Sequence, residues 1–131
     1  MVENSDAIID LEGISILIAK DVDLNYYFIE RILKKTKAIV FWAENGQEAV
    51  ELCRKNKDIA LVIMDIQMPI LNGWEATRQI KEFRQDLPII ALTAYALSNE
   101  EEKSTEAGCN GFLTKPIKPK ILISELKKFL P

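Results

Sequence analysis

The sequence predicts an α/β protein with a doubly wound parallel β-sheet, in which helices cover both faces. Five short apolar runs alternate with five segments that are predicted to be helices, and this alternation is typical of βαβ units. The runs are apolar along their whole length, which indicates strands that are buried on both faces. A chain of 131 residues suits one domain and can bury a sizeable core.

The predicted strands are rich in β-branched and other apolar residues. They cover residues 14–19, 38–43, 60–65, 88–93 and 111–115. The segment before them, residues 1–13 (MVENSDAIIDLEG), is polar at first and has no clear period. We interpret residues 1–13 as a linker or lead-in, and residues 14–131 as the folded domain.

Between the strands, apolar residues recur at spacings that place them on one face of a helix. These faces comprise Leu24, Phe28 and Ile32; Ala49 and Cys53; Ala76, Ile80 and Phe83; and, near the end, Leu122, Leu126 and Phe129. The fourth helix, residues 98–107, is nearly all polar. It is predicted from Ser98 followed by Glu101, the spacing of a capping box.

Composition excludes several classes of function. The net charge of −3 gives no reason to expect a nucleic-acid or membrane surface on this domain. No apolar run approaches the roughly 18 residues of a membrane span. Cys53 and Cys109 lack metal spacing, and the chain has no histidine, so a Ser-His-Asp or Cys-His nucleophile is excluded. We interpret the cysteines as reduced thiols of a cytosolic domain.

Charged or hydroxyl residues stand at the ends of four predicted strands. They are Asp21, Asp65, Thr93 and Lys115. Ligands of such sheets bind beyond the carboxyl ends of the strands, so these side chains should converge on one cleft. Taken singly, each has an ordinary structural explanation: a helix cap, a turn, a strand threonine and a surface lysine. Together, a carboxylate, a hydroxyl and an ammonium at one sheet edge suit phosphate chemistry.

The same residues carry a family resemblance. The segments LVIMDIQMPILNG (61–73), PIIALTAYA (88–96), AGCNGFLTKPIKP (107–119) and AENGQEAVEL (43–52) are similar to those of receiver domains of two-component signalling. The resemblance extends from Ile14 to Leu130. It implies a flavodoxin-like (βα)5 fold with strand order 2-1-3-4-5.

The resemblance also implies roles for the residues of the cleft. Asp65 would be the phospho-acceptor, which takes a phosphoryl group from the phosphohistidine of a histidine kinase or histidine phosphotransfer protein. Lys115 would pair with Asp65 and then with a phosphoryl oxygen. The bond from Lys115 to Pro116 would be cis. Thr93 would donate its hydroxyl to the phosphoryl group once it forms.

Mg²⁺ is the cofactor that the resemblance implies. Asp21, Asp65 and the backbone carbonyl of Gln67 would hold it, with water in the other positions. Phe112 stands at the position of an aromatic switch, where a ring turns inward as Thr93 moves. Simple core packing of a strand aromatic is the alternative interpretation of Phe112, and the sequence does not decide between them.

The resemblance places the output surface on the fourth helix, fifth strand and fifth helix. Because SNEEEKSTEAG has no apolar stripe, we expect the fourth helix to be the more easily displaced element. The motifs AENGQEAV, ALTAYA and FLTKPIKP are most similar to those of receivers in hybrid sensor histidine kinases, which favours such a parent over a single-domain regulator. The domain would be cytoplasmic; membrane anchoring of the parent and the oligomeric state stay open.

Rival classes of protein fit less well. Phosphatases of the haloacid dehalogenase type require a second aspartate two residues after the nucleophile, where this chain has Gln67. A flavodoxin would carry a phosphate loop rich in serine, threonine and glycine after its first strand, and KDVDLN is not one. Neither G-x-G-x-x-G nor G-K-[ST] occurs, so an enzyme with its own small-molecule substrate is the last choice.

Lys20 departs from the family pattern. Receivers usually present two adjacent acidic residues after the first strand, and the first place here holds Lys20. We interpret Asp23 as the helix cap, which does not replace the lost acid. An ammonium in this place is expected to lower Mg²⁺ affinity by about ten- to a thousandfold.

Two hypotheses follow from Lys20. In the first, the domain is a phospho-acceptor with weak Mg²⁺ demand, and Lys20 pairs with Asp65 or a phosphoryl oxygen. In the second, it is a pseudo-receiver, a protein-interaction module that Lys20 holds in one state. The first is favoured because a domain free of phosphotransfer would not require Asp21, Asp65, Thr93 and Lys115 together.

Overall fold

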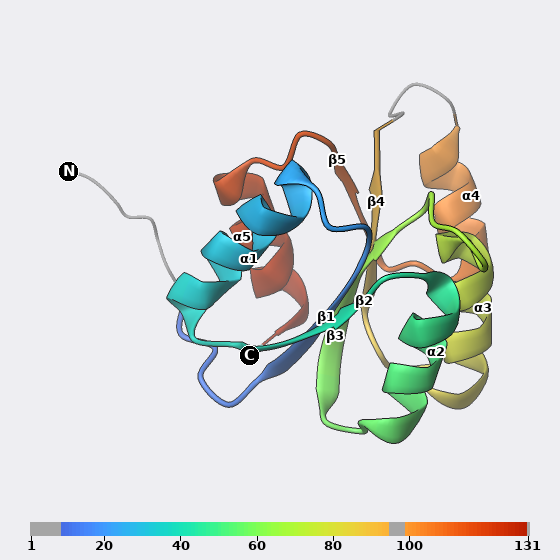
Figure 1. The fold of residues 1–131 in the computed structure, drawn as a ribbon, viewed down its shortest axis with the longest axis horizontal. Coiled ribbons are helices and arrows are strands. Elements are labelled where there is room, and N and C mark those ends of the chain that lie inside the picture. Colours follow the sequence, from blue (N-terminus) through green and yellow to red (C-terminus); the bar gives the residue numbers. More distant parts are fainter. Residues whose placement is uncertain (1–8, 95–98, 131) are drawn as a thin grey trace.

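A computed structural model of the chain describes residues 9–94 and 99–130 and confirms the predicted α/β architecture. Its parallel five-stranded sheet has the order β2-β1-β3-β4-β5. Helices α1 and α5 cover one face of the sheet, and α2, α3 and α4 cover the other (Figure 1). This is the flavodoxin-like arrangement that the family resemblance implied.

The elements alternate strictly along the chain. The strands are β1 (Ser15–Ala19), β2 (Ile39–Ala43), β3 (Ile59–Asp65), β4 (Ile89–Thr93) and β5 (Gly111–Thr114). The helices are α1 (Leu24–Thr36), α2 (Gly46–Lys55), α3 (Gly73–Phe83), α4 (Glu100–Ala107) and α5 (Pro119–Phe129). Each strand boundary lies within one residue of its predicted place.

The core has one cluster of apolar side chains on each face of the sheet. Neighbouring residues of β1 alternate between them, since Ile16 and Ile18 join the cluster beneath α1 and α5, whereas Leu17 and Ala19 join the one beneath α2 and α3. All five residues of β1 and of β4 are buried. Burial on both faces explains why the strands are apolar at nearly every position.

Strand register aligns the strand ends at the carboxyl edge of the sheet. Ala19 pairs with Met64, Asp65 with Leu92, and Thr93 with Thr114. The residues that end β3 and β4, and those that follow β1 and β5, therefore lie along one edge. After each strand the chain continues from this edge, through a loop, into the next helix.

Helix α1 buries a face other than the one that carries Leu24 and Phe28. The residues that α1 buries are Tyr26, Ile29, Leu33 and Thr36. Leu24 is 87% exposed and Phe28 is 41% exposed, while Ile32 is partly buried against the core. The helix carries apolar residues on two faces, and periodicity alone does not say which one meets the sheet. The predicted helix is confirmed, and the structure shows that Leu24 and Phe28 lie on its exposed side.

Side-chain caps fix the start of three helices. Asp23, Asn45 and Asn72 each accept a hydrogen bond from the backbone N–H three residues on, which satisfies a donor that has no partner within the helix. The prediction that Asp23 caps the first helix is confirmed. Helix α4 begins at Glu100 after Asn99, whose side chain makes no capping bond; the predicted cap, Ser98, lies outside the described residues.

Helix α4 is held by few apolar contacts. Its only buried residues are Ser104 and Ala107. The indole N–H of Trp74 in α3 donates to the Ser104 hydroxyl at 3.0 Å, and Lys103 lies over the same ring. Helix α5, in contrast, buries Leu122 and Leu126 in the core. Among the described residues, α4 is therefore attached to α3 mainly through the contacts of Ser104 and Lys103 with Trp74.

The segment before β1 packs on the domain where the structure describes it. Leu11 is fully buried, and its N–H donates to the Thr36 carbonyl at 2.7 Å. The boundary at residue 14 stays a prediction. None of the described helices combines the length and the apolar character needed to cross a membrane.

Hydrogen exchange should distinguish α4 from α5. Because α4 buries only Ser104 and Ala107, we expect its amides to exchange faster than those of α5 at neutral pH. Exchange followed by mass spectrometry or NMR measures the two helices in one sample. Equal protection of residues 100–107 and 119–129 would contradict this expectation.

Candidate functional site

The Asp65 carboxylate lies at the centre of the carboxyl edge. Asp65 ends β3 and is only 3% exposed. Its Oδ2 accepts a hydrogen bond from Lys115 Nζ at 2.8 Å, and its Oδ1 accepts one from the Gln67 N–H at 3.0 Å. A cation and a backbone donor thus stabilise the ionised carboxylate in a place that water hardly reaches.

Gly73 lets the chain approach Asp65 closely. A Cβ at Gly73 would lie 2.3 Å from the Asp65 carbonyl oxygen, so a larger residue there would displace the backbone. The Gly73 N–H donates to the Ile66 carbonyl at 2.9 Å. The glycine in the segment DIQMPILNG therefore fixes the start of α3 against the strand end that carries Asp65.

Lys20 points into the same cleft. It follows β1 and is fully buried. Its Nζ donates to Asp23 Oδ1 at 2.7 Å and to the Asp21 carbonyl at 3.0 Å, and lies 3.9 Å from Asp65 Oδ2. Two ammonium groups, those of Lys20 and Lys115, therefore flank one oxygen of Asp65.

The Asp23 carboxylate both binds Lys20 and caps α1. Its Oδ1 accepts both the Lys20 ammonium and the capping N–H of Tyr26 at 2.9 Å. Burial acts to raise the pKa of Asp23, but the hydrogen bonds from Lys20 and Tyr26 outweigh burial and hold this pKa below its ordinary value of 3.8. Asp23 is therefore ionised at neutral pH and balances the buried charge of Lys20.

The structure places Thr93 beside α4. Thr93 ends β4, is 1% exposed, and its hydroxyl donates to Oε1 of Glu100 in the first turn of α4. A cavity of about 430 Å³ opens here between the loop after β3 and the start of α4, and Gln67, Trp74 and Glu100 are among its lining residues. The cleft is thus linked to α4 by a side-chain hydrogen bond.

Two further predictions concern the last strand. The peptide bond between Lys115 and Pro116 is cis, as the resemblance implied. Phe112 is partly buried in β5 and is not among the side chains packed against either core cluster. Its role as an aromatic switch stays a prediction.

The structure brings most of the predicted site residues together. Asp65, Lys115 and Lys20 form one group of charges, while Thr93 ends the neighbouring strand. The Asp21 side chain is exposed, and the structure describes only its carbonyl in contact with Lys20. Sequence reasoning missed Glu100 as the acceptor for Thr93, because Thr93 ends a strand and Glu100 begins the next helix, and no single period relates residues of two different elements.

The chain belongs to the family of the response regulator receiver domain, whose sequence profile matches residues 16–127. It is 31% identical over 118 residues to the polar-differentiation response regulator DivK of Brucella anthropi, with 88% of this chain and 95% of DivK covered. It is 37% identical over 115 residues to hybrid signal transduction histidine kinase I of Dictyostelium discoideum. That match covers 82% of this chain but only 7% of the kinase.

Solved structures agree with this assignment. The receiver domain of a sensor histidine kinase from Pseudomonas aeruginosa, with a magnesium ion coordinated in its active-site cleft, has a TM-score of 0.82 and 34% identity, over 89% of this chain and 97% of that one. A chain in the co-crystal of the Saccharomyces cerevisiae phosphotransfer protein Ypd1 with the receiver domain of Ssk1 has a TM-score of 0.82 and 31% identity, with coverage of 91% and 90%.

The residues of this cleft fit Mg²⁺ poorly. Magnesium requires oxygen ligands in octahedral geometry, commonly one or two carboxylates with water and carbonyl groups. Asp21, Asp65 and the Gln67 carbonyl would be such ligands, but the Lys20 ammonium bonds to the backbone carbonyl of Asp21 and lies 3.9 Å from Asp65 Oδ2, so a positive charge already stands beside them. Within residues 9–94 and 99–130, no three acidic or cysteine side chains gather in a way that would hold a metal ion.

Removal of the Asp65 charge should destabilise the fold. Asp65→Asn would leave the buried ammonium of Lys20 and that of Lys115 without the carboxylate between them. We expect the free energy of unfolding to fall by about 3 kcal/mol. Urea denaturation followed by circular dichroism measures this.

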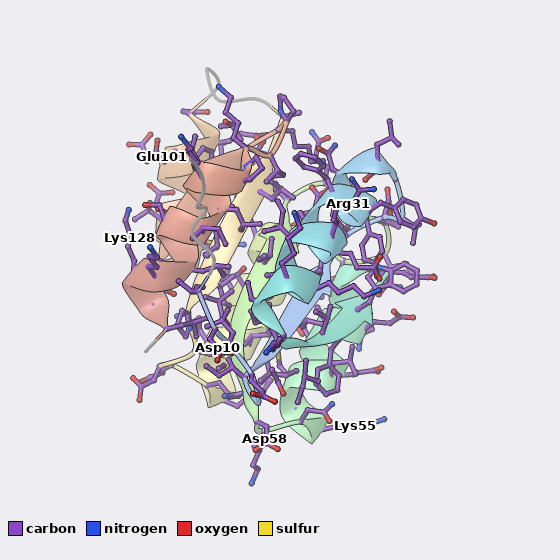
Figure 2. All side chains as sticks on the ribbon, turned by 90° about the vertical axis from the view of Figure 1, so that its left-hand side faces the viewer. Asp10, Arg31, Lys55, Asp58, Glu101 and Lys128 are labelled. Carbon is purple, nitrogen blue, oxygen red and sulfur yellow. The ribbon has the colours of Figure 1, made fainter. Side chains whose placement is uncertain are left out.

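Asp58→Asn is the matched control for this measurement. Asp58 is exposed just before β3, the strand whose other end carries Asp65, and Figure 2 shows it at the lower end of the molecule. Its substitution should change the free energy of unfolding by less than about 0.5 kcal/mol. An Asp65→Asn protein as stable as the wild type would show that the two ammonium groups do not need the carboxylate.

Proposed function

We propose that this domain accepts a phosphoryl group on Asp65 from the phosphohistidine of a histidine kinase or a histidine phosphotransfer protein. The observation that carries the proposal is the Asp65 carboxylate itself, buried and paired with Lys115 at 2.8 Å at the carboxyl end of the sheet. Membership of the receiver family supports it. The domain would comprise residues 14–131, and a parent hybrid histidine kinase remains the favoured context.

The transfer exchanges one bond to phosphorus for another. A carboxylate oxygen of Asp65 forms a bond to phosphorus while the bond from phosphorus to the imidazole nitrogen breaks. The electron pair of that bond stays on the nitrogen. Because the other ring nitrogen carries a proton, the partner's histidine is left as a neutral imidazole. Negative charge gathers on the phosphoryl oxygens, so nearby cations such as Lys115 lower the barrier.

Thr93 and Glu100 would couple the acyl phosphate to α4. A threonine hydroxyl carries a single proton, so Thr93 cannot donate to Glu100 and to a phosphoryl oxygen at the same time. Phosphorylation of Asp65 would draw the hydroxyl away from Glu100 and weaken one of the few contacts that hold α4. The responding surface would be that of α4, β5 and α5. In the view of Figure 2, Glu101 of α4 and Lys128 of α5 both lie at the left, although the two helices cover opposite faces of the sheet.

The partner would dock beside α1. Exposed apolar side chains gather in the loop after β1 and in the first two turns of α1: Val22 at 43%, Leu24 at 87%, Tyr27 at 56% and Phe28 at 41% exposure. This patch begins next to Asp21 and Lys20, so a partner seated there would bring its histidine to the cleft. The relative that was crystallised with Ypd1 supports a phosphotransfer protein as the partner.

A pseudo-receiver that only binds a protein is the second candidate. The observation in its favour is Lys20, which already supplies a cation near Asp65. A domain of this class would bind its partner through the same patch without being phosphorylated. Phosphorylation of Asp65 therefore discriminates between the two candidates.

Treatment with acetyl phosphate should add one phosphoryl group to the wild-type domain. The Asp65→Asn variant should remain unmodified, because an amide oxygen is a poor nucleophile. Intact-mass spectrometry detects the added group, and acid or hydroxylamine treatment identifies the acyl phosphate. Equal modification of the wild type and of Asp65→Asn would remove Asp65 as the acceptor.

Docking through α1 should be separable from the chemistry. We expect Leu24→Ala to slow phosphotransfer from a histidine phosphotransfer protein by about tenfold, because an exposed anchor is lost from the interface. Its reaction with acetyl phosphate, which needs no docking, should be unchanged. The rates are measured with a phosphotransfer protein that phosphorylates the wild-type domain.

Ile39→Ala is the matched control for docking. Ile39 begins β2 and is 50% exposed, at the amino edge of the sheet and so far from the cleft. Its substitution should leave transfer from the partner unchanged. Equal slowing by Leu24→Ala and Ile39→Ala would place the docking surface elsewhere.

A further inference from the structure

Lys20 brings an ammonium group into the cleft beside Asp65, one of the expected metal ligands. Its ammonium contacts the Asp21 carbonyl and the Asp23 carboxylate at hydrogen-bond distance and faces Asp65 Oδ2 at 3.9 Å. The side chain is fully buried, so it is held in the cleft and not in solvent. A buried ammonium is stable only where oxygen atoms surround it, and these three supply them.

Lys20 makes the formal charge of the cleft much less negative. Asp21, Asp23 and Asp65 contribute three negative charges, and Lys20 and Lys115 contribute two positive charges, which leaves a net charge of −1. An acidic residue at position 20 would leave four carboxylates and one ammonium, a net charge of −3. The cleft with Lys20 therefore attracts a divalent cation more weakly than a cleft with an acidic residue in that place.

One N–H donor of Lys20 has no hydrogen-bond partner among the described residues. An ammonium has three N–H donors, and among the described residues two of them are used, by Asp21 and Asp23. Asp65 Oδ2, at 3.9 Å, is within ion-pair distance but beyond hydrogen-bond distance. A phosphoryl group on Asp65 would carry its oxygens into the space between the carboxylate and this ammonium.

We propose that Lys20 is the resident cation of the cleft, so that Asp65 of this domain is phosphorylated without a divalent metal ion. Lys20 then contacts a phosphoryl oxygen and offsets the charge that develops during transfer. Asp23 is the positioning residue that holds the ammonium in place. This inference rests on the proposed phosphotransfer function and goes beyond it, because it assigns the cation to the chain itself.

The first test compares phosphorylation in EDTA and in saturating Mg²⁺. With acetyl phosphate as donor, the carboxylate displaces acetate, which leaves with the electron pair of the broken bond to phosphorus. We expect the wild-type rate in EDTA to be within about threefold of its rate in Mg²⁺. A wild-type rate that falls to the level of Asp65→Asn in EDTA and returns with Mg²⁺ would overturn the proposal.

Variants of Lys20 separate its charge from its bulk. Lys20→Met retains an unbranched buried side chain without charge and should lose about tenfold or more of the rate in EDTA. Lys20→Glu should make the rate depend on Mg²⁺. If Lys20→Met is phosphorylated in EDTA as fast as the wild type, the ammonium has no part in the transfer.

Metal binding is a second readout that needs no phosphotransfer. The Trp42 indole N–H donates to the Lys20 carbonyl at 2.9 Å, so the fluorescence of Trp42 reports on this loop. Lys20→Glu should bind Mg²⁺ at least about tenfold more tightly than the wild type. Equal affinities would overturn the charge balance that underlies the proposal, whether or not Asp65 accepts a phosphoryl group.

Asp23→Asn tests the positioning role. Asparagine is as good a helix cap as aspartate, so α1 and the stability of the domain should be kept, as circular dichroism will show. The substitution removes the negative charge that holds Lys20. The rate of phosphorylation in EDTA should therefore fall, while phosphorylation in Mg²⁺ should continue. A rate in EDTA equal to that of the wild type would show that Asp23 serves only as a cap.

The two proposals fail in different ways. If neither the wild type nor Lys20→Glu is phosphorylated in Mg²⁺, the proposed function fails, and with it the role of Lys20 in transfer. If the wild type is phosphorylated only in Mg²⁺, the proposed function stands and the resident cation is excluded. Phosphorylation of the wild type in EDTA together with its loss in Lys20→Met supports both.

Discussion

The buried Asp65 carboxylate and the two ammonium groups beside it are the constraint on which the rest of the site depends. A carboxylate that is only 3% exposed must be compensated, and Lys115 at 2.8 Å and Lys20 at 3.9 Å supply the charge. Lys20 in turn requires Asp23 and the Asp21 carbonyl. The loop after β1 is thus fixed by the need to balance one charge at the end of β3.

The parallel sheet makes this arrangement possible. Asp65, Lys115 and Lys20 belong to three different strand ends, and the order β2-β1-β3-β4-β5 places β3 at the centre with β1 and β4 beside it. Parallel pairing brings all carboxyl ends to one edge, where loops are free to carry polar groups. Strands β1 and β4, on either side of β3, are buried along their whole length and hold the end of β3 in place.

The helices around the sheet differ in how they are attached and in what they expose. Helix α1 buries one apolar face against the core and leaves Leu24 and Phe28 exposed beside the cleft, which is the character expected of an interaction surface. Helix α4 buries little and is held by Trp74 and by the bond from Thr93 to Glu100. A change at Asp65 would therefore act on α4, a weakly attached helix, as a conformational switch requires.

The sequence by itself determined the fold class, the strands and the residues at the strand ends, because apolar runs and helical spacing reflect burial directly. Similarity of motifs added the strand order, which the structure confirms, and the proposed roles of Asp65, Thr93 and Lys115. The buried face of α1 was decided only by tertiary packing, since the helix carries two apolar faces and Tyr26 and Ile29 meet the sheet. The direction of Lys20 was likewise decided in three dimensions. A lysine after a strand is compatible with solvent or with a cleft, and only the convergence of Asp21, Asp23 and Asp65 oxygens shows that the ammonium is held inside.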